Sequence, residues 1–160
     1  KLIMDTDKDS KEIYKDYVEN LLYNHDIVLV SQFIKDLSFD KKEDFLFFEE
    51  DDFKGKSNFN LNIDVENQEH NDDTLLVTLR VNLVGSLNEK NIFVLELDYC
   101  GVFQMPQVSQ EIMEKQVKIE CPKMLFPYVR RIISQIMVES GLPNVDIKNI
   151  NFFEMYKENT

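Results

Sequence analysis

The chain has 160 residues, with 18 Lys and Arg against 30 Asp and Glu, so its formal net charge at pH 7 is −12. This length fits one domain that can bury a hydrophobic core. So negative a charge argues against nucleic acid as a partner, because phosphates select for basic surfaces, and it favours basic partners. No apolar run approaches the roughly 18 residues of a membrane-spanning helix, so we expect no direct membrane insertion.

The N-terminal 26 residues are predicted to be a partly helical extension, ahead of a single domain over residues 27–160. Between residues 6 and 23, apolar residues recur at steps of three and four, which is typical of an amphipathic helix. The β-branched run at residues 26–39 predicts the first strand. The apolar stripe of the extension consists of Ile13, Tyr14, Tyr17, Val18, Leu21 and Leu22.

Residues 40–57 predict an acidic loop around four apolar residues at positions 45–48. Two interpretations of this loop stay open. In the first, the aromatic residues pack on the core and the charges guard against aggregation. In the second, the loop is an aromatic flap over a groove.

The middle of the chain contains three stretches in which apolar and polar residues alternate, as in strands with one buried face. Short polar connections make the three strands antiparallel neighbours. The apolar positions are Phe59, Leu61, Ile63 and Val65 in the first stretch, Leu75, Val77, Leu79, Val81 and Leu83 in the second, and Phe93, Leu95, Leu97 and Tyr99 in the third.

After these strands, Gly101 and Pro106 interrupt the strand pattern, so residues 102–120 are predicted to cross to another layer as a long connection. A helix follows, and Gly141 is a natural terminator for it. Its start is left open. Either Pro127 takes the first helical position, or Pro122 does and Pro127 kinks the helix at a cost of about 3 kcal/mol.

The charges of this predicted helix oppose its dipole, because Arg130 and Arg131 lie near its start and Glu139 near its end. We therefore expect an acidic partner, in the same chain or another subunit, for at least one arginine. Further on, Asn151 with Glu154 three residues later resembles a capping box and predicts a short second helix.

A catalytic site cannot be assembled from these residues. His25 and His70 lie at a predicted helix end and in a polar turn, where solvated histidines are expected. Phosphate-binding glycine motifs and metal-ligand spacings are missing. The two cysteines, Cys100 and Cys121, form no CxxC pair, which favours a reducing compartment over a disulfide framework. Cys121 has only Lys123 nearby to lower its pKa, so we expect neither an enzyme nor a cofactor.

The C-terminal third carries the motif CPKMLFPYVRRII, which runs into SGLPNVDIKNINFFEMY. Together these resemble the signature half of the SecB family of bacterial protein-export chaperones. The stretches FIKDLSFD, FNLNIDV, TLLVTLRVNLVGSL and IFVLELDYCGVFQM resemble the four strands of that family in order. The resemblance covers residues 28–157. The acidic aromatic loop and the longer N-terminal segment depart from the family pattern.

This resemblance implies an α+β fold, with a four-stranded antiparallel sheet backed by a long and a short C-terminal helix. It implies a homotetramer built as a dimer of dimers. The implied function is a cytoplasmic holdase that uses no ATP, binds unfolded precursor proteins, keeps them translocation-competent and delivers them to the SecA motor ATPase of the Sec export pathway. Two alternatives are a SecB-like chaperone dedicated to a toxin–antitoxin system and an enzyme that uses Cys121.

By analogy with the family, three sets of residues are expected to form its working surfaces. For several of the client-binding residues, a plain core role is the alternative. The acids at three of the four motor-binding positions match the basic tail that the motor presents in this family. The client groove is assigned to Phe59, Leu61, Ile63, Val102, Phe103, Met105, Phe152, Phe153 and Tyr156, motor binding to Asp36, Asp40, Val94 and Glu96, and the oligomer interface to Leu95, Leu97 and Tyr99.

Overall fold

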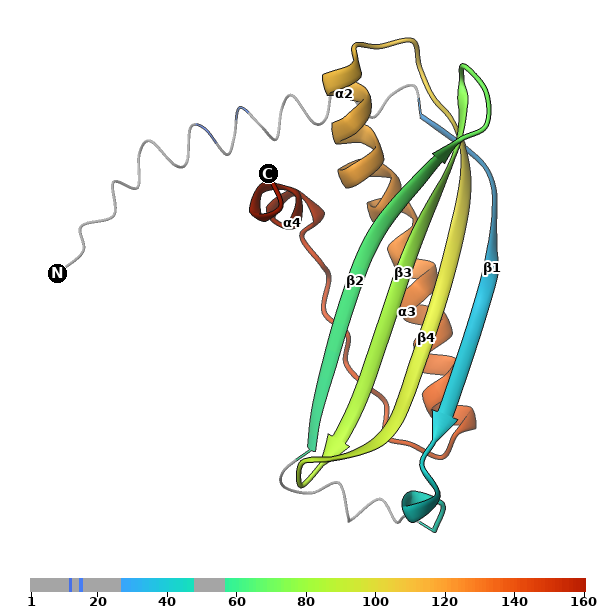
Figure 1. The fold of residues 1–160 in the computed structure, drawn as a ribbon, viewed down its shortest axis with the longest axis vertical. Helices are drawn as coiled ribbons and strands as arrows, with labels where there is room; N and C mark the ends of the chain where they lie inside the picture. The colour runs from blue at the N-terminus through green and yellow to red at the C-terminus, as the bar shows by residue number, and fades with distance from the viewer. Residues whose placement is uncertain (1–11, 13–14, 16–26, 48–56) are drawn as a thin grey trace, which may run out of the picture.

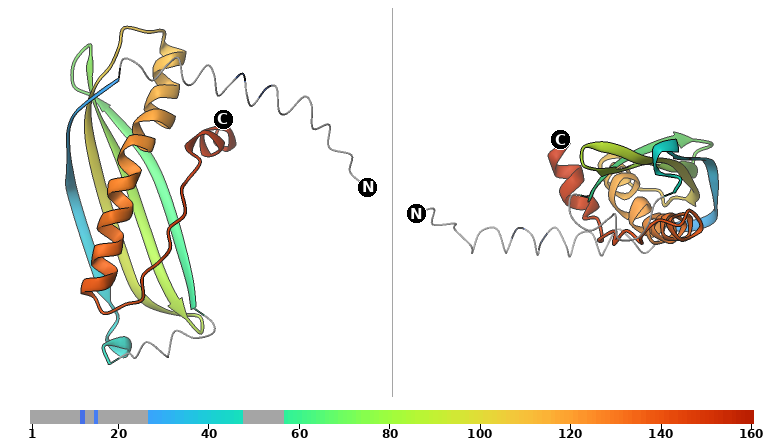
Figure 2. Two further views of the ribbon diagram at one scale, coloured as in Figure 1. Left: turned by 180° about the vertical axis from the view of Figure 1, so that it is seen from behind. Right: turned by 90° about the horizontal axis from the view of Figure 1, so that it is seen from below.

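The computed structural model, which describes residues 12, 15, 27–47 and 57–160, has two layers (Figure 1). One layer is a sheet of four long strands, and the other is helical and lies along one face of that sheet (Figure 2). This arrangement confirms the predicted α+β fold. The strands are β1 (Val28–Lys41), β2 (Ser57–Glu69), β3 (Thr74–Leu87) and β4 (Lys90–Gln104), and the helical elements are η1 (Glu43–Phe45), α2 (Gln110–Lys115), η3 (Gln116–Glu120), α3 (Cys121–Glu139) and α4 (Phe152–Glu158).

The sheet has the order β1-β4-β3-β2, and every neighbouring pair is antiparallel. The β3–β4 hairpin turns at Asn88 and Glu89, both with positive φ, as tight hairpin turns require. All four predicted strands are confirmed. The order leaves β1 and β2 as the two edge strands.

Two predictions fall partly outside the described residues. Of the predicted helix over residues 6–23, only Glu12 and Lys15 are described, and both are helical. The loop between β1 and β2 is described as far as Phe47. There Phe45 packs against the core while Phe47 is 98% exposed. The packed interpretation therefore holds for Phe45 and not for Phe47.

The prediction of a long crossing segment over residues 102–120 is wrong. β4 continues through Gly101 to Gln104, and the connection to the helical layer spans only residues 105–109. Gly101 is part of the strand and does not break it. The absence of a side chain at this position makes room for α3, because a Cβ there would lie 2.7 Å from Leu125 Cδ2. The helical layer then starts where the Ser109 hydroxyl accepts a hydrogen bond from the Ile112 N–H (3.4 Å).

Of the two predicted starts of the long helix, the one at Pro122 is confirmed, because α3 begins at Cys121 with Pro122 in its first turn and Pro127 inside it. The sequence did not predict that α2 and η3 extend the helical structure back to Gln110. The widened turn η3 ends at Glu120, two residues before Pro122, and its last bond runs from the Cys121 N–H to the Gln116 carbonyl. Such a π turn shifts the hydrogen-bond register just where a proline nitrogen has no hydrogen to donate.

The core lies between the sheet and α3. Buried residues recur along α3 at steps of three and four, so one stripe of the helix faces the strands. The helix ends as predicted at Gly141, whose φ is +67°, while the Leu142 N–H donates to the Met137 carbonyl (3.0 Å). In the described residues, no helix is long and apolar enough to span a bilayer.

Candidate functional site

The sheet has an inner face toward α3 and an outer face away from it. Residues paired across neighbouring strands share a face. Asp36 pairs with Asp98, Ser38 with Glu96, and Asp40 with Val94, and all of them lie on the outer face. The structure therefore brings together Asp36, Asp40, Val94 and Glu96, the four residues predicted to bind the motor.

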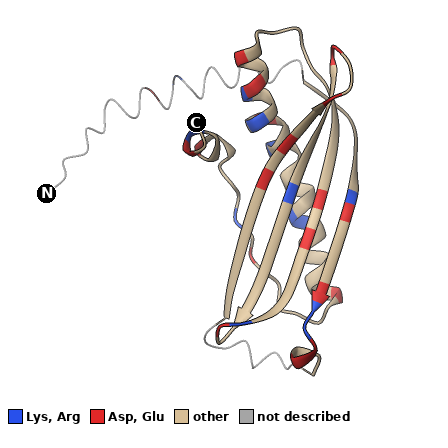
Figure 3. Ribbon diagram, in the orientation of Figure 1, with Lys and Arg blue, Asp and Glu red and all other residues tan. Residues whose placement is uncertain are grey.

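A single arginine lies among the carboxylates of the outer face. Arg80 Nε donates to Asp98 Oδ1 (3.1 Å) and its Nη1 donates to Glu66 Oε1 (2.9 Å). The hydrogen bond to Asp98, its charge and that of Glu66 raise the pKa of Arg80 above its ordinary value. Asp64 is paired across from Arg80 on β2. Figure 3 shows this one basic position on β3 between acidic positions of β2 and β4.

The ion pairs around Arg80 were missed by the sequence analysis. The alternation placed Arg80 and Asp98 on the polar faces of their strands, but only the register shows that they are directly opposite. Because one arginine on β3 cannot balance the carboxylates on β1, β2 and β4, the outer face remains acidic. A flat acidic face of this kind fits a basic partner.

Five of the nine predicted client-binding residues are half-buried on the helical side of the molecule. Phe59, Leu61 and Ile63 lie on the inner face of β2, the edge strand, while Phe153 and Tyr156 come from α4. All five pack against the core without being enclosed by it. They are the predicted groove residues that remain accessible to a client.

A pocket of about 300 Å³ lies at this edge, between β2, α2, η3 and α4. Tyr156 and Met155 of α4 supply apolar lining, and Asp64 and Glu114 supply carboxylates. The Lys118 ammonium closes one side by donating to the Val65 carbonyl (2.7 Å). A mixed lining of this kind can hold an apolar side chain and also interact with polar groups of the backbone beside it.

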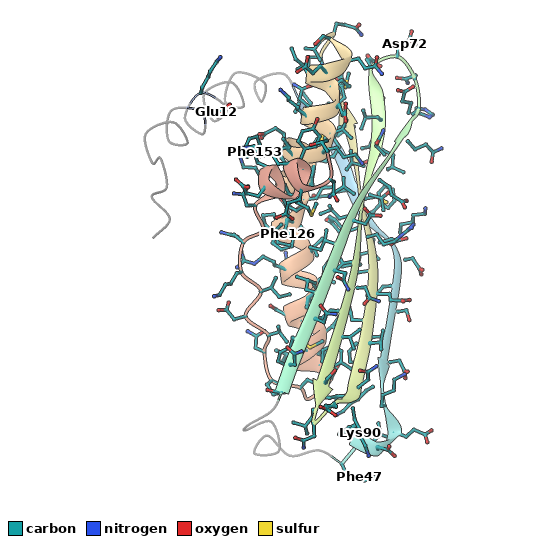
Figure 4. The ribbon with its side chains drawn as sticks, turned by 60° about the vertical axis from the view of Figure 1, so that its left-hand side comes forward. Glu12, Phe47, Asp72, Lys90, Phe126 and Phe153 are labelled. Carbon is teal, nitrogen blue, oxygen red and sulfur yellow. The ribbon has the colours of Figure 1, made fainter. Side chains whose placement is uncertain are left out.

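The other four predicted groove residues lie elsewhere. Phe103, Met105 and Phe152 are 0%, 4% and 3% exposed, so they belong to the core. Phe152 packs edge-on against the Phe126 ring of α3, with ring centroids 5.7 Å apart. Val102 is half-buried on the outer face, opposite Leu76. Figure 4 shows Phe126 on α3 and Phe153 on α4, where the Lys157 ammonium lies 4.5 Å from the Phe153 ring centroid.

The residues predicted to form the oligomer interface are covered within one chain. Leu95, Leu97 and Tyr99 are at most 6% exposed, on the inner face of β4. The Tyr99 ring stacks on Tyr128 of α3, with centroids 6.4 Å apart. Burial, with a smaller contribution from Tyr128, raises the pKa of Tyr99. The structure therefore places all three beneath α3.

Exposed apolar residues are found instead along the edge strand β1. Ile34 and Leu37 are 45% and 40% exposed on its inner face, and Phe33 is 44% exposed on its outer face. An edge strand with apolar side chains on both faces is suited to contact with another chain. The sequence signal for this surface was the adjacent apolar pair Phe33 and Ile34, which puts an apolar side chain on each face of β1.

Cys121 lies in an environment unlike that of a nucleophile. Its side chain is fully buried, and burial, together with the nearby Glu120 carboxylate, raises the pKa of its thiol. The second cysteine, Cys100, is also buried, with its Sγ 3.2 Å from the Thr78 hydroxyl. The Cys121 thiol is therefore protonated at neutral pH, and both thiols are shielded from solvent, unlike reactive cysteines.

The sequence predicted an acidic partner for at least one of the two arginines. Within the chain, the Arg130 guanidinium instead donates a hydrogen bond to the amide oxygen of Asn149. The premise behind that prediction was also wrong. Helical structure starts at Gln110, so Arg130 and Arg131 lie in the middle of the helix, far from the positive end of its dipole.

Comparison with known proteins gives the same family in two ways. A family model described as SecB, preprotein translocase subunit, matches residues 23–160. The protein-export protein SecB of Hyphomonas neptunium is 34% identical over 131 residues, which cover 81% of this chain and 75% of that protein. That of Ruegeria pomeroyi is 32% identical over 134 residues, which cover 81% and 78%.

A solved structure shares the fold. It is a SecB-like chaperone from Mycobacterium tuberculosis, in complex with a peptide from an antitoxin. It superposes with a TM-score of 0.64 over 78% of this chain and 91% of that chain, at 8% sequence identity. At so low an identity the likeness concerns the fold alone.

Proposed function

Because this chain belongs to the SecB family of protein-export chaperones, we propose that it is an ATP-independent holdase of the Sec export pathway. It binds unfolded precursor proteins in the cytoplasm, keeps them translocation-competent and delivers them to SecA. The observation that supports this most is the family match over residues 23–160, joined to a sheet whose accessible surfaces differ in chemistry.

Clients bind at the β2 edge. An unfolded chain offers apolar side chains and unpaired backbone groups, and this side of the sheet offers half-buried aromatic residues and an edge strand. Each Leu-sized or Phe-sized side chain buried there yields about 1.5 to 3 kcal/mol before ordering costs. Several such edges in one assembly engage one client by effective concentration, so no single edge has to bind tightly.

SecA docks on the outer face. Asp36, Asp40 and Glu96 are exposed carboxylates on neighbouring strands, and Val94 is a half-buried apolar contact among them. The net charge of −12 extends their attraction for a basic partner. Clients and motor then occupy different surfaces of one sheet, which allows both to be bound at the moment of delivery.

The chain assembles as a dimer of dimers through β1. Its apolar residues Phe33, Ile34 and Leu37 are exposed in one chain, whereas Leu95, Leu97 and Tyr99 are beneath α3. The native mass is expected to be about four times 19.0 kDa. Leu37→Lys should lower that mass, and an unchanged mass in this variant would place the interface elsewhere.

The holdase activity is tested by light scattering from a refolding, aggregation-prone protein. Stoichiometric amounts of the full chain should suppress the scattering without ATP. Tyr156→Ser, at the client edge, should weaken the suppression, while the exposed Tyr128→Ser on α3 serves as the matched control. Absence of any suppression by the unaltered chain would contradict the holdase function.

A chaperone dedicated to a toxin–antitoxin pair is the alternative with the same fold. The two functions differ in client range, because a dedicated chaperone recognises one partner sequence and an export chaperone recognises many. A panel of unrelated unfolded proteins separates them. Suppression of aggregation for most of the panel supports the export function, and suppression for none of it supports the dedicated one.

A further inference from the structure

The backbone groups of the edge strand β2 point alternately toward β3 and toward the open side of the sheet (Figure 1). Just past the end of β2, the His70 N–H donates to the Thr74 carbonyl (2.9 Å). The pairing of β2 with β3 has no shift in register, so the even-numbered residues of β2 bond to β3. The odd-numbered residues therefore direct their N–H and C=O groups toward the open edge.

At Val65, one of these odd-numbered residues, side chains occupy both edge-facing backbone groups. Its N–H donates to Asp64 Oδ1 (3.1 Å), and its carbonyl accepts from Lys118 Nζ (2.7 Å). Val65 is also buried. Because a backbone N–H has one hydrogen to donate, a second chain can pair with Val65 as a strand only if both side chains move away.

The odd-numbered residues before Val65 differ from it. Phe59, Leu61 and Ile63 are half-buried. Within the described part of the chain, no hydrogen bond joins their edge-facing N–H or C=O groups to another residue. They span about 14 Å of strand, at 3.4 Å per residue. An extended peptide can therefore pair with all three, and its residues opposite them share the inner face, where apolar side chains fit.

The occupied position adjoins the pocket of about 300 Å³ at this edge, because Asp64, Val65 and Lys118 all line that pocket. A strand that stops before Val65 leaves the edge beside Met155 and Tyr156 of α4, which line the same pocket. The next apolar side chain of the bound peptide then lies within reach of the pocket. The two side chains on Val65 thus direct a bound chain away from the sheet edge and toward α4.

We propose that clients add to β2 as an extended strand over Phe59–Ile63, and that Asp64 and Lys118 form a stop that ends this strand at Val65. The inference deepens the proposed function and rests on it, because the occupant is a segment of an unfolded client. The class of segment is extended, with an apolar residue at every second position and a free amide on each of these residues. Charged side chains at sheet edges limit strand pairing in this way.

Hydrogen exchange at single amides, followed by NMR in the full chain, tests the proposal. The probe is a synthetic peptide in which phenylalanine, leucine and valine alternate with threonine and glutamine. At about ten times its dissociation constant, the peptide should slow exchange of the Phe59, Leu61 and Ile63 N–H groups about ten-fold, because about one chain in ten stays unbound. The Val65 N–H should keep its exchange rate.

Removing the stop should lengthen the protected stretch. In the opened variant, Asp64→Ala with Lys118→Met, the peptide should slow exchange of the Val65 N–H about ten-fold relative to the same variant without peptide. The matched control is Glu66→Ala with Lys115→Met. It removes the same two charges from side chains that pair with other residues, so the peptide should leave exchange at Val65 unchanged.

A second peptide separates strand addition from contacts made by side chains alone. It has the same sequence, but the amide nitrogens of its apolar residues are methylated, so it keeps the side chains and loses the donors. It should bind the unaltered chain about ten-fold more weakly. Equal binding of the two peptides, or binding without slower exchange at Leu61 and Ile63, would overturn the proposal and leave the holdase function standing.

Other outcomes would also count against the proposal. Equal protection of Val65 in the opened variant and its control would mean that Asp64 and Lys118 form no stop. A rise in the native mass of the opened variant without peptide would assign the edge to a second copy. If neither peptide binds to a chain that suppresses aggregation, the proposal alone is overturned. If the chain also fails to suppress aggregation, the proposed function is contradicted and the inference falls with it.

Discussion

The two faces of the sheet are built from the same strands, one residue out of phase, and they do different work. On β4, Leu97 is 1% exposed beneath α3, while its neighbour Glu96 is exposed on the outer face. The inner face contributes hydrophobic stability, and the outer face contributes charge. A substitution on the inner face should therefore alter the stability of the fold, and one on the outer face should alter the binding of a partner.

The largest effect is expected from the contact between α3 and the inner face. Leu125→Ala removes a side chain that is fully buried against Gly101 of β4, so it should lower the free energy of unfolding by about 2 to 5 kcal/mol. Denaturant unfolding at fixed chain concentration measures it. Val138→Ala on the exposed side of α3 is the control and should cost less than about 0.5 kcal/mol. Similar losses in both would contradict a core beneath α3.

A smaller effect is expected from filling the space above Gly101. A Cβ there would lie 2.7 Å from both Leu125 Cδ2 and Phe103 Cε2, so Gly101→Ala should cost about 1 to 3 kcal/mol. Combining it with Leu125→Ala should cost less than the sum of the two, because the shortened side chain leaves room. Strict additivity in this double-mutant cycle would mean that the two residues do not touch.

Glu120, on the inner side of the molecule, gives the stability of the fold a pH dependence. Burial raises its pKa, and Lys123, whose Nζ lies 3.7 Å away, offsets part of the rise. Because the folded chain holds this proton more tightly, stability is fullest below the unfolded pKa of about 4.3 and falls as pH rises through the folded value. The free energy of unfolding is measured as a function of pH. Glu120→Gln should remove its fall with rising pH, whereas Glu139→Gln, at an exposed position, should retain that fall.

The smallest effect on stability is expected at Arg80. Its ion pairs are solvent-exposed, so Arg80→Gln should leave the unfolding midpoint nearly unchanged. The same change makes the outer face more negative, so a basic peptide should bind more tightly and with a steeper salt dependence. Lys148→Gln is the matched control, because it removes one exposed positive charge outside the sheet. Weaker peptide binding would mean that Arg80 itself contacts the partner.

Periodicity predicted the sheet well, because each strand buries one face. The polar residues that alternate with apolar ones between Phe59 and Val65, and between Phe93 and Tyr99, therefore lie on the opposite face. It failed at Gly101 and Pro106. A glycine inside a strand looks like a break in the sequence, but here it admits Leu125 of the helix. Pro122 did mark the start of α3, but the helical turns α2 and η3 ahead of it were not predicted, because the π turn has no clear sequence pattern.

The candidate sites were predictable where the alternation of residues along a strand is enough to assign each side chain to a face of the sheet. Asp36, Asp40, Val94 and Glu96 share a face because paired residues do. Which apolar residues form a groove depends on where the helical layer ends, and Phe103 and Phe152 proved to be core while Phe153 stays half-buried. The Arg80 ion pairs depend on strand register, which alternation within each strand does not determine.

The outer face as the docking surface for SecA is tested most directly by titrating the basic tail of SecA against the full chain, Glu96→Lys and Glu139→Lys. Both variants reverse one exposed carboxylate, but only Glu96 lies on the outer face. At low salt, Glu96→Lys should weaken binding on the order of ten-fold, with Glu139→Lys close to the unaltered chain and the difference shrinking as salt is added. Equal binding by the two variants would contradict docking on this face.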